Sequence, residues 1–122
     1  MEKWVKRRLL SFKYAFKGVF YVIRTQTNMR IHLILTLVAL FLGWFLKINK
    51  IEWLFITLAI FAVLVSEMIN TAIEEIMDLL YPKFNTKVGI IKDIAAGVVL
   101  LFAVFAIIIG VIIFLPKIIN LL

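Results

Sequence analysis

The sequence predicts an all-α integral membrane protein, in which an N-terminal amphipathic helix on the membrane surface precedes three transmembrane helices. Two observations predict this class. The chain of 122 residues is 65% hydrophobic, with a mean hydropathy of +1.11, whereas soluble domains are about half apolar. Three long apolar segments, separated by short polar breaks, hold most of this excess. Residues 1–122 form a single domain at this length, and the absence of cysteine excludes a secreted disulfide scaffold.

Residues 1–28 are expected to form the surface helix. On a helical wheel, one side holds apolar residues and another holds basic residues, the pattern of a helix that lies in the membrane interface. A plain membrane anchor without chemistry explains this segment equally well. The membrane surface also accounts for the net charge of +7, so no nucleic-acid partner is expected. The apolar side comprises Val5, Leu9, Phe12, Phe16, Val19, Phe20 and Ile23, and the basic side comprises Lys3, Lys6, Lys13, Lys17 and Arg24.

Three transmembrane helices follow, each of which needs about 20 mostly apolar residues to cross a hydrocarbon core of roughly 30 Å. The first span is slightly short, so we expect it to be tilted or joined to the preceding helix. The second is long enough only if its polar end continues the same helix. Pro82 and Pro116 are expected to end the second and third helices. The predicted bounds are 29–48, 52–80 and 88–115.

The basic residues predict how the chain is oriented. Of the 14 Lys and Arg residues, 11 lie before the first span or between the second and third spans, and three lie elsewhere. Cytoplasmic loops carry the excess of basic residues in membrane proteins. The N-terminus and the 81–93 loop are therefore expected in the cytoplasm, with the C-terminus on the outer side.

The polar end of the second span carries the candidate site. Glu67, Asn70, Glu74 and Asp78 are spaced by three, four and four residues, so they fall within about 80° of arc on one helix face. A charge near the bilayer centre costs about 2.5–3.5 kcal/mol, so this face should contact protein, water or ions. From the helical rise of about 1.5 Å, Glu67 lies a few ångströms below the cytoplasmic surface. Glu74 lies at that surface and Asp78 outside it.

Lys92 and Asp93 open the third span at a similar depth, and the small residues 95–97 follow them. Small residues leave room for a partner helix or a lipid head group, and Ala106 and Gly110 add a further small-x-x-x-small edge. Paired carboxylates suit Mg²⁺, which also binds phosphates, and a carboxylate at membrane depth suits a general base for a lipid hydroxyl. The alternative is a helix-packing network whose outer charges are merely solvated. No Walker A or G-x-G-x-x-G motif is present.

The residues of this site resemble a known signature. The run Glu67-Met68-Ile69-Asn70-Thr71-Ala72-Ile73-Glu74, followed by Asp78 and Lys92-Asp93, is similar to the E-x-x-N-[ST]-A-[IV]-E…D…KD pattern of the prokaryotic diacylglycerol kinase family. The resemblance covers nearly the whole chain. Segments 11–18 and 28–32 are more similar to the undecaprenol kinase branch of Gram-positive bacteria than to the diacylglycerol branch.

The resemblance implies a lipid kinase of the bacterial plasma membrane that uses ATP and Mg²⁺. It implies a homotrimer with sites shared between subunits, and a preference for undecaprenol over diacylglycerol. Glu67 is implied as the general base that takes the proton of the lipid alcohol, and Glu74 as a ligand of Mg²⁺ and ATP. The remaining implied contacts are Asn70, Asp78, Lys92 and Asp93 for ATP, and Glu67, Asn70 and Ala96 for the lipid.

Gln26 departs from the family pattern. The family usually has a Glu at this position, two residues before Asn28, as a second metal carboxylate. An amide oxygen can bind Mg²⁺ but carries no charge, so we expect Gln26 to be a weaker metal ligand beside Glu74. Glu75 is near but at a less favourable angle. His32 is interpreted as an interfacial residue near the start of the first span.

Two other functions remain open at this stage. The first is a small transporter that uses Glu67 as its membrane carboxylate. A transporter needs polar groups through the whole depth of the membrane, whereas the outer halves of all three spans are apolar. The second is a catalytically inactive relative of the kinases, and Gln26 is the one feature that favours it.

Overall fold

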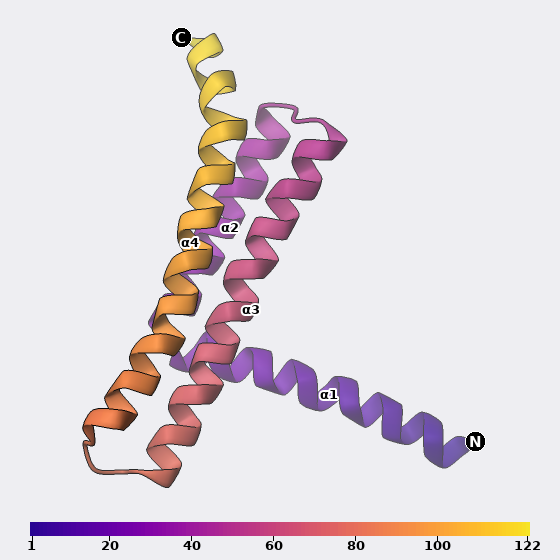
Figure 1. The fold of residues 1–122 in the computed structure, drawn as a ribbon. Coiled ribbons are helices and arrows are strands. Elements are labelled where there is room, and N and C mark those ends of the chain that lie inside the picture. Colours follow the sequence, from indigo (N-terminus) through magenta and orange to yellow (C-terminus); the bar gives the residue numbers. More distant parts are fainter.

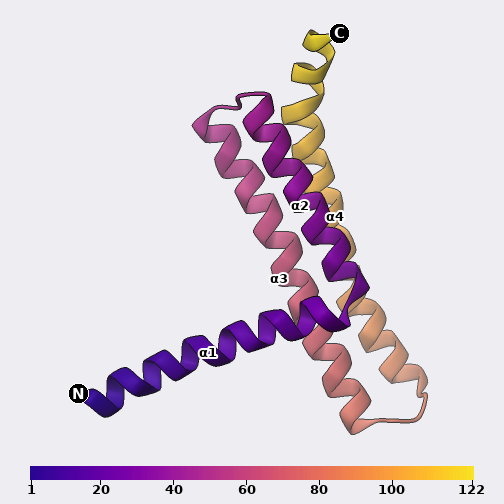
Figure 2. The same cartoon turned by 180° about the vertical axis from the view of Figure 1, so that it is seen from behind.

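The computed structural model describes all 122 residues as four α-helices. Helices α2, α3 and α4 stand side by side, and α1 projects crosswise from them (Figure 1, Figure 2). Helices α2, α3 and α4 are each long and apolar enough to cross a membrane, so the predicted all-α class with three long apolar helices is confirmed. The helices are α1 (Glu2–Thr25), α2 (Thr27–Phe45), α3 (Lys50–Leu80) and α4 (Thr86–Leu121).

Helices α1 and α2 meet at an elbow centred on Gln26. The backbone of Gln26 is extended, with φ −111° and ψ 113°, so the predicted helix 1–28 is interrupted here. Arg30 stabilises this bend between α1 and α2, since its guanidinium donates hydrogen bonds to the carbonyls of Ile23 and Arg24 at 3.2 and 2.7 Å. These carbonyls belong to the last turn of α1, where no following turn can satisfy them. Helix α2 therefore begins at Thr27, two residues before the predicted bound of 29.

A tight turn connects α2 to α3. Lys47 adopts a positive φ of 53°, and the amides of Lys47 and Ile48 donate to the carbonyls of Trp44 and Gly43 at 3.3 and 3.2 Å. This is the hydrogen-bond pattern of a Schellman helix end. It ends α2 at Phe45, three residues before the predicted bound of 48.

Helix α3 begins with a capping box, two residues before the predicted bound of 52. The side chain of Asn49 accepts a hydrogen bond from the Glu52 amide at 2.9 Å, and the Asn49 amide donates to the Glu52 carboxylate at 3.1 Å. From there α3 continues without a break to Leu80. The polar residues from Glu67 onward therefore belong to the spanning helix, as its predicted length required.

The two prolines differ in effect. Helix α3 ends at Leu80, just before Pro82, as expected, but Pro116 lies inside α4, which continues to Leu121. The prediction that Pro116 ends the third helix is therefore wrong. A proline removes one hydrogen bond of the helix. The other backbone groups of an apolar helix have no better partner than their own helix, so the helix continues past the proline.

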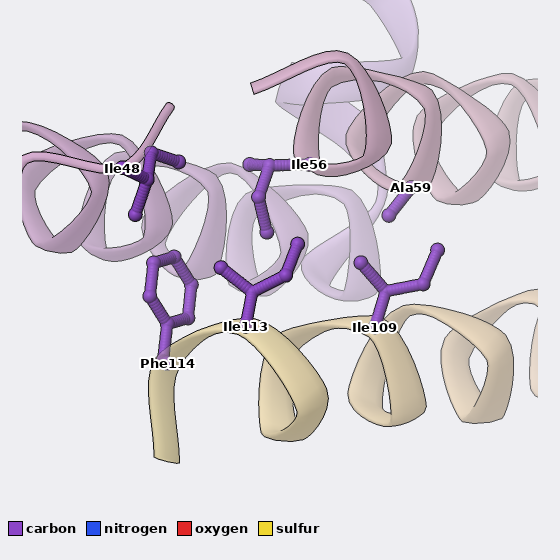
Figure 3. Packing of buried hydrophobic residues seen from close by; sticks show 6 residues of the cluster. All are labelled: Ile48, Ile56, Ala59, Ile109, Ile113 and Phe114. Carbon is purple, nitrogen blue, oxygen red and sulfur yellow. The ribbon is translucent and has the colours of Figure 1, made fainter. Parts of the chain in front are cut away.

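An apolar cluster closes the bundle at the end that holds the α2–α3 turn. Figure 3 shows how its side chains meet between α3 and α4. Beside it, Lys117 of α4 forms an ion pair with Glu52 of α3 at 3.3 Å. The polar residues of α3 lie toward the opposite end, where α1 crosses the bundle. The cluster comprises Ile48, Ile56, Ala59, Ile109, Ile113 and Phe114.

Candidate active site

Glu67 is buried at the centre of the candidate site, and its side chain is 2% exposed. The buried hydroxyl groups beside it are satisfied locally, since Ser66 and Thr71 donate to carbonyls of their own helix at 2.7 and 2.9 Å. Two buried polar atoms lack a partner, namely Oε2 of Glu67 and Oδ1 of Asn70. A buried acceptor without a partner costs about 1–3 kcal/mol. Such atoms are rare in folded proteins, and a catalytic or binding role is one explanation for them.

Asn70 lies between Glu67 and Glu74 on the same face of α3. The Asn70 amide donates a long hydrogen bond of 3.4 Å to the Glu74 carboxylate, which leaves its own oxygen unpaired. The helix therefore brings together Glu67, Asn70 and Glu74, as the spacing of these residues predicted. Their free oxygens are the donor type that Mg²⁺ prefers.

These oxygens fit a magnesium site only in part. No group of three His, Asp or Glu side chains surrounds a single position in the chain. However, Mg²⁺ is usually held by one or two protein oxygens, with phosphates and water completing its six ligands. The Glu74 carboxylate and the free Asn70 oxygen fit that pattern.

Asp78 and Lys92 lie at the exposed end of the face. They form an ion pair that joins α3 to α4, with side chains 64% and 34% exposed. Both helices extend here beyond the level at which α1 crosses them (Figure 2). Asp93 and Ala96 are exposed, and no hydrogen bond or ion pair joins Asp93 to the site. One subunit therefore brings Asp78 and Lys92 together but leaves Asp93 and Ala96 at its surface.

Gln26 and Glu75 both lie near the elbow, but neither contacts Glu74 through a hydrogen bond. The Gln26 side chain is partly buried and makes no hydrogen bond. Glu75 instead accepts a hydrogen bond of 2.6 Å from the hydroxyl of Tyr21, which fastens α1 to α3. This hydrogen bond and the negative charge of Glu75 together raise the pKa of Tyr21 above its ordinary value of 10.0.

His32 is the residue that sequence reasoning missed. Its Nε2 atom lies 3.9 Å from the unpaired Oε2 of Glu67, and its side chain is only 17% exposed. The interpretation of His32 as an interfacial residue did not include this contact with Glu67. A signal was present: His32 lies 15 residues before Lys47, and Glu67 lies 17 residues after Lys50. Two antiparallel helices joined by a short turn place such residues at similar depth.

Comparison with known proteins shows the family to which the chain belongs. The family model for prokaryotic diacylglycerol kinase matches residues 13–114. The chain belongs to the prokaryotic diacylglycerol kinase family. It is 38% identical to the undecaprenol kinase of Bacillus subtilis, over 93% of this chain and 92% of that relative. It is also 36% identical to the diacylglycerol kinase of a Synechocystis species, over 93% of this chain but only 66% of that relative.

Membership of this family makes the chain a membrane lipid kinase and confirms the resemblance inferred from the Glu67–Glu74 run. A kinase requires a nucleotide as phosphoryl donor. The transporter interpretation of Glu67 has no support among these relatives.

Proposed function

We propose that this protein transfers the γ-phosphoryl group of ATP, together with Mg²⁺, to undecaprenol, with diacylglycerol as a weaker substrate. The choice of lipid rests on the match to the undecaprenol kinase, which covers 93% of this chain and 92% of that relative. The match to the diacylglycerol kinase leaves about a third of that relative uncovered, since the chain spans 66% of it.

The buried Glu67 carboxylate, with its unpaired Oε2, is the observation that carries this proposal. A lipid hydroxyl approaches from the membrane, whereas ATP approaches from the cytoplasm, so the acceptor of the hydroxyl proton has to lie between them. Glu67 is at the buried end of a continuous polar face. The same face leads through Asn70 and Glu74 to the exposed ion pair of Asp78 and Lys92.

In this mechanism, Oε2 of Glu67 accepts the proton of the lipid hydroxyl while the hydroxyl oxygen attacks the γ-phosphorus. The bond between the γ-phosphorus and the bridging oxygen breaks, and ADP leaves with that oxygen. Magnesium, when bound, neutralises phosphate charge, and the oxygens of Glu74, Asn70 and Gln26 would hold it. Lys92 is placed to attract the phosphates. The burial of Glu67 restricts water, which would otherwise compete with the lipid for the phosphoryl group.

The position of α1 supports the proposed orientation in the membrane. Phe12, Phe16 and Phe20 lie on the predicted apolar side of α1 and are 66%, 63% and 60% exposed. An exposed aromatic stripe beside a basic one is suited to the interface between lipid and water. With α1 in that plane, Asp78 and Lys92 project into the cytoplasm. From the distribution of the basic residues, we propose that the N-terminus and the 81–93 loop lie on that side of the bacterial plasma membrane and the C-terminus outside.

We further propose that the active form is a homotrimer with sites shared between subunits. Only 17 of the 122 residues are buried within one subunit. Asp93 and Ala96, which the family resemblance places in the site, are exposed. A neighbouring subunit would cover them and the partly exposed Glu74.

Transfer of radiolabelled phosphate from ATP to lipid alcohols tests the proposed function. Purified protein in mixed micelles is supplied with undecaprenol, a shorter polyprenol or diacylglycerol, and labelled lipid is separated by thin-layer chromatography. We expect undecaprenol to give the highest kcat/KM, with the Glu67→Gln protein as background. A higher value for diacylglycerol would overturn the proposed substrate. No transfer to any alcohol would favour the inactive relative.

A further inference from the structure

An apolar cavity of about 260 Å³ lies between α2, α3 and α4, and His32 is part of its lining. Ten of the 13 lining residues are hydrophobic, and the other three are His32, Thr36 and Gly110. The Thr36 hydroxyl already donates its proton to the carbonyl of His32 at 2.8 Å. The imidazole of His32 is therefore the one side chain in the lining that can donate a hydrogen bond to a ligand oxygen. It is also the side chain that faces Glu67.

The separation of 3.9 Å between Nε2 of His32 and Oε2 of Glu67 is too long for a direct hydrogen bond. It does suit one oxygen atom placed between them. An oxygen about 2.8 Å from each atom would subtend an angle of roughly 90° at itself, which is acceptable for a hydroxyl. Such a hydroxyl would donate to Glu67, whose Oε2 has no other partner, and would accept from His32.

We infer that the hydroxyl of the lipid alcohol binds between Glu67 and His32, and that the first part of its hydrocarbon chain fills the cavity. This inference rests on the proposed lipid kinase function and deepens it. His32 becomes a second substrate-binding residue, which holds the hydroxyl oxygen while Glu67 accepts its proton. The remaining lone pair of that oxygen is free to attack the γ-phosphorus.

The cavity also selects among lipid alcohols. Its volume of about 260 Å³ is below the roughly 300–1,000 Å³ of ordinary small-molecule pockets, so it has room for one chain near the hydroxyl rather than two. A diacylglycerol carries ester carbonyls close to its hydroxyl. Those carbonyls would be buried against hydrophobic residues without a donor, which is unfavourable. A polyprenol has a single hydrocarbon chain directly behind its hydroxyl, so it suits this lining.

Substitution of His32 tests the polar half of the inference. We expect His32→Leu to lower kcat/KM for undecaprenol by about 10- to 100-fold, as loss of a buried hydrogen bond would, while the KM for ATP stays unchanged. His32→Gln, which keeps an N–H donor, should recover part of the loss. A merely structural role would alter the KM for both substrates and would not be rescued by Gln. Wild-type lipid kinetics in His32→Leu would overturn the inference.

Filling the cavity tests its apolar half. Ala103 lines the cavity, whereas the adjacent Val104 is outside it and exposed. We expect Ala103→Phe to lower kcat/KM for undecaprenol at least tenfold and Val104→Phe to leave it nearly unchanged. Equal effects of the two substitutions would contradict the assignment of the cavity to the lipid chain.

A binding measurement separates this inference from the proposed function. A single-chain polyprenol analogue with a photoreactive diazirine near its hydroxyl is cross-linked to the protein, and the labelled residues are identified by mass spectrometry. Labelling of cavity residues that is lost in His32→Leu and competed by undecaprenol supports the inference even if no phosphate is transferred. Labelling confined to the outer surface of the bundle overturns it, even in an active enzyme.

Discussion

At the scale of single residues, Glu67 has a side chain 2% exposed and an oxygen without a partner. Its role is tested by Glu67→Gln, which preserves the size of the side chain but removes the base. We expect kcat to fall by about 10²–10⁴-fold, the usual contribution of a general base. The helical content and gel-filtration volume should match those of the wild type. Near-normal turnover would remove Glu67 from this role.

Gln26 is the second residue whose substitution is informative. If its amide oxygen binds the same Mg²⁺ as Glu74, Gln26→Glu supplies a second carboxylate. The Mg²⁺ concentration for half-maximal activity should then fall by about tenfold, which corresponds to roughly 1.4 kcal/mol. Mn²⁺ binding, measured by electron paramagnetic resonance, should tighten in parallel.

The alternative is that ATP phosphates and water complete the metal site and that Gln26 faces lipid head groups or solvent. In the single subunit the Gln26 side chain makes no hydrogen bond, which agrees both with direct binding of Mg²⁺ and with this alternative. Gln26→Met, which removes the amide oxygen, is the matched control and should weaken Mn²⁺ binding only if Gln26 is a ligand. Superimposable Mg²⁺ curves for the wild type and Gln26→Glu would contradict direct ligation.

Tyr21 offers a test of pH dependence. Its hydrogen bond to Glu75, together with the negative charge of that carboxylate, raises the pKa of the Tyr21 hydroxyl above 10.0. A raised pKa in the folded protein means that the contact stabilises α1 against α3 below pH 10. This stabilisation is lost as the pH rises through the higher folded pKa.

The ionisation of Tyr21 can be followed by the ultraviolet absorbance of its phenolate, as the difference between the wild type and Tyr21→Phe. We expect Glu75→Gln to move the Tyr21 transition to lower pH, because the carboxylate charge that opposes ionisation is gone. An unchanged transition would show that the two side chains do not interact in solution.

At the scale of helices, the close approach of α2 to α3 depends on Gly43. A Cβ atom at this position would lie 2.6 and 2.9 Å from two ring carbons of Trp53. Gly43→Ala should therefore destabilise the protein by about 1–3 kcal/mol through overpacking, seen as a lower midpoint of thermal unfolding in detergent. Gly89→Ala is the matched control, since its Cβ would be 3.8 Å from Phe84.

A second substitution tests whether the Trp53 ring causes the destabilisation by Gly43→Ala. The two atoms that clash belong to the six-membered part of the Trp53 ring. Trp53→Phe should therefore make Gly43→Ala less harmful than it is in the wild-type background. If Gly43→Ala destabilised the wild type and Trp53→Phe equally, the strain would lie elsewhere in the turn.

At the scale of the whole molecule, one subunit leaves much of its polar site unshielded. Glu74 and Lys92 are partly exposed and Asp93 is exposed. Ala106 and Gly110, which were expected to offer a packing edge, line the cavity within the subunit instead.

We expect the oligomer to be the active unit. Protein fractions of defined mass, separated in detergent and measured by light scattering, should show phosphate transfer that follows the trimer and is absent from the monomer. Mixing inactive Glu67→Gln subunits with inactive Lys92→Ala subunits adds a second test, because shared sites would restore part of the activity. Full activity in monodisperse monomers would contradict this expectation.

Much of this protein follows from local properties of the chain. The three spans follow from apolar length, and the face shared by Glu67, Asn70 and Glu74 follows from the helical period. Both depend on residues close together in the sequence, so they need no knowledge of how the helices pack. The Glu67–Glu74 run also sufficed to indicate the kinase family.

Contacts between helices were decided only by the tertiary structure. The pairing of His32 with Glu67, the hydrogen bond between Tyr21 and Glu75 and the cavity behind His32 all depend on how α1 and α2 are rotated and set against α3. Periodicity shows which residues share a face, but in a helix apolar on all sides it does not show which neighbour that face meets. That choice is made by close packing, as at Gly43 and Trp53, where a single missing Cβ lets two helices approach.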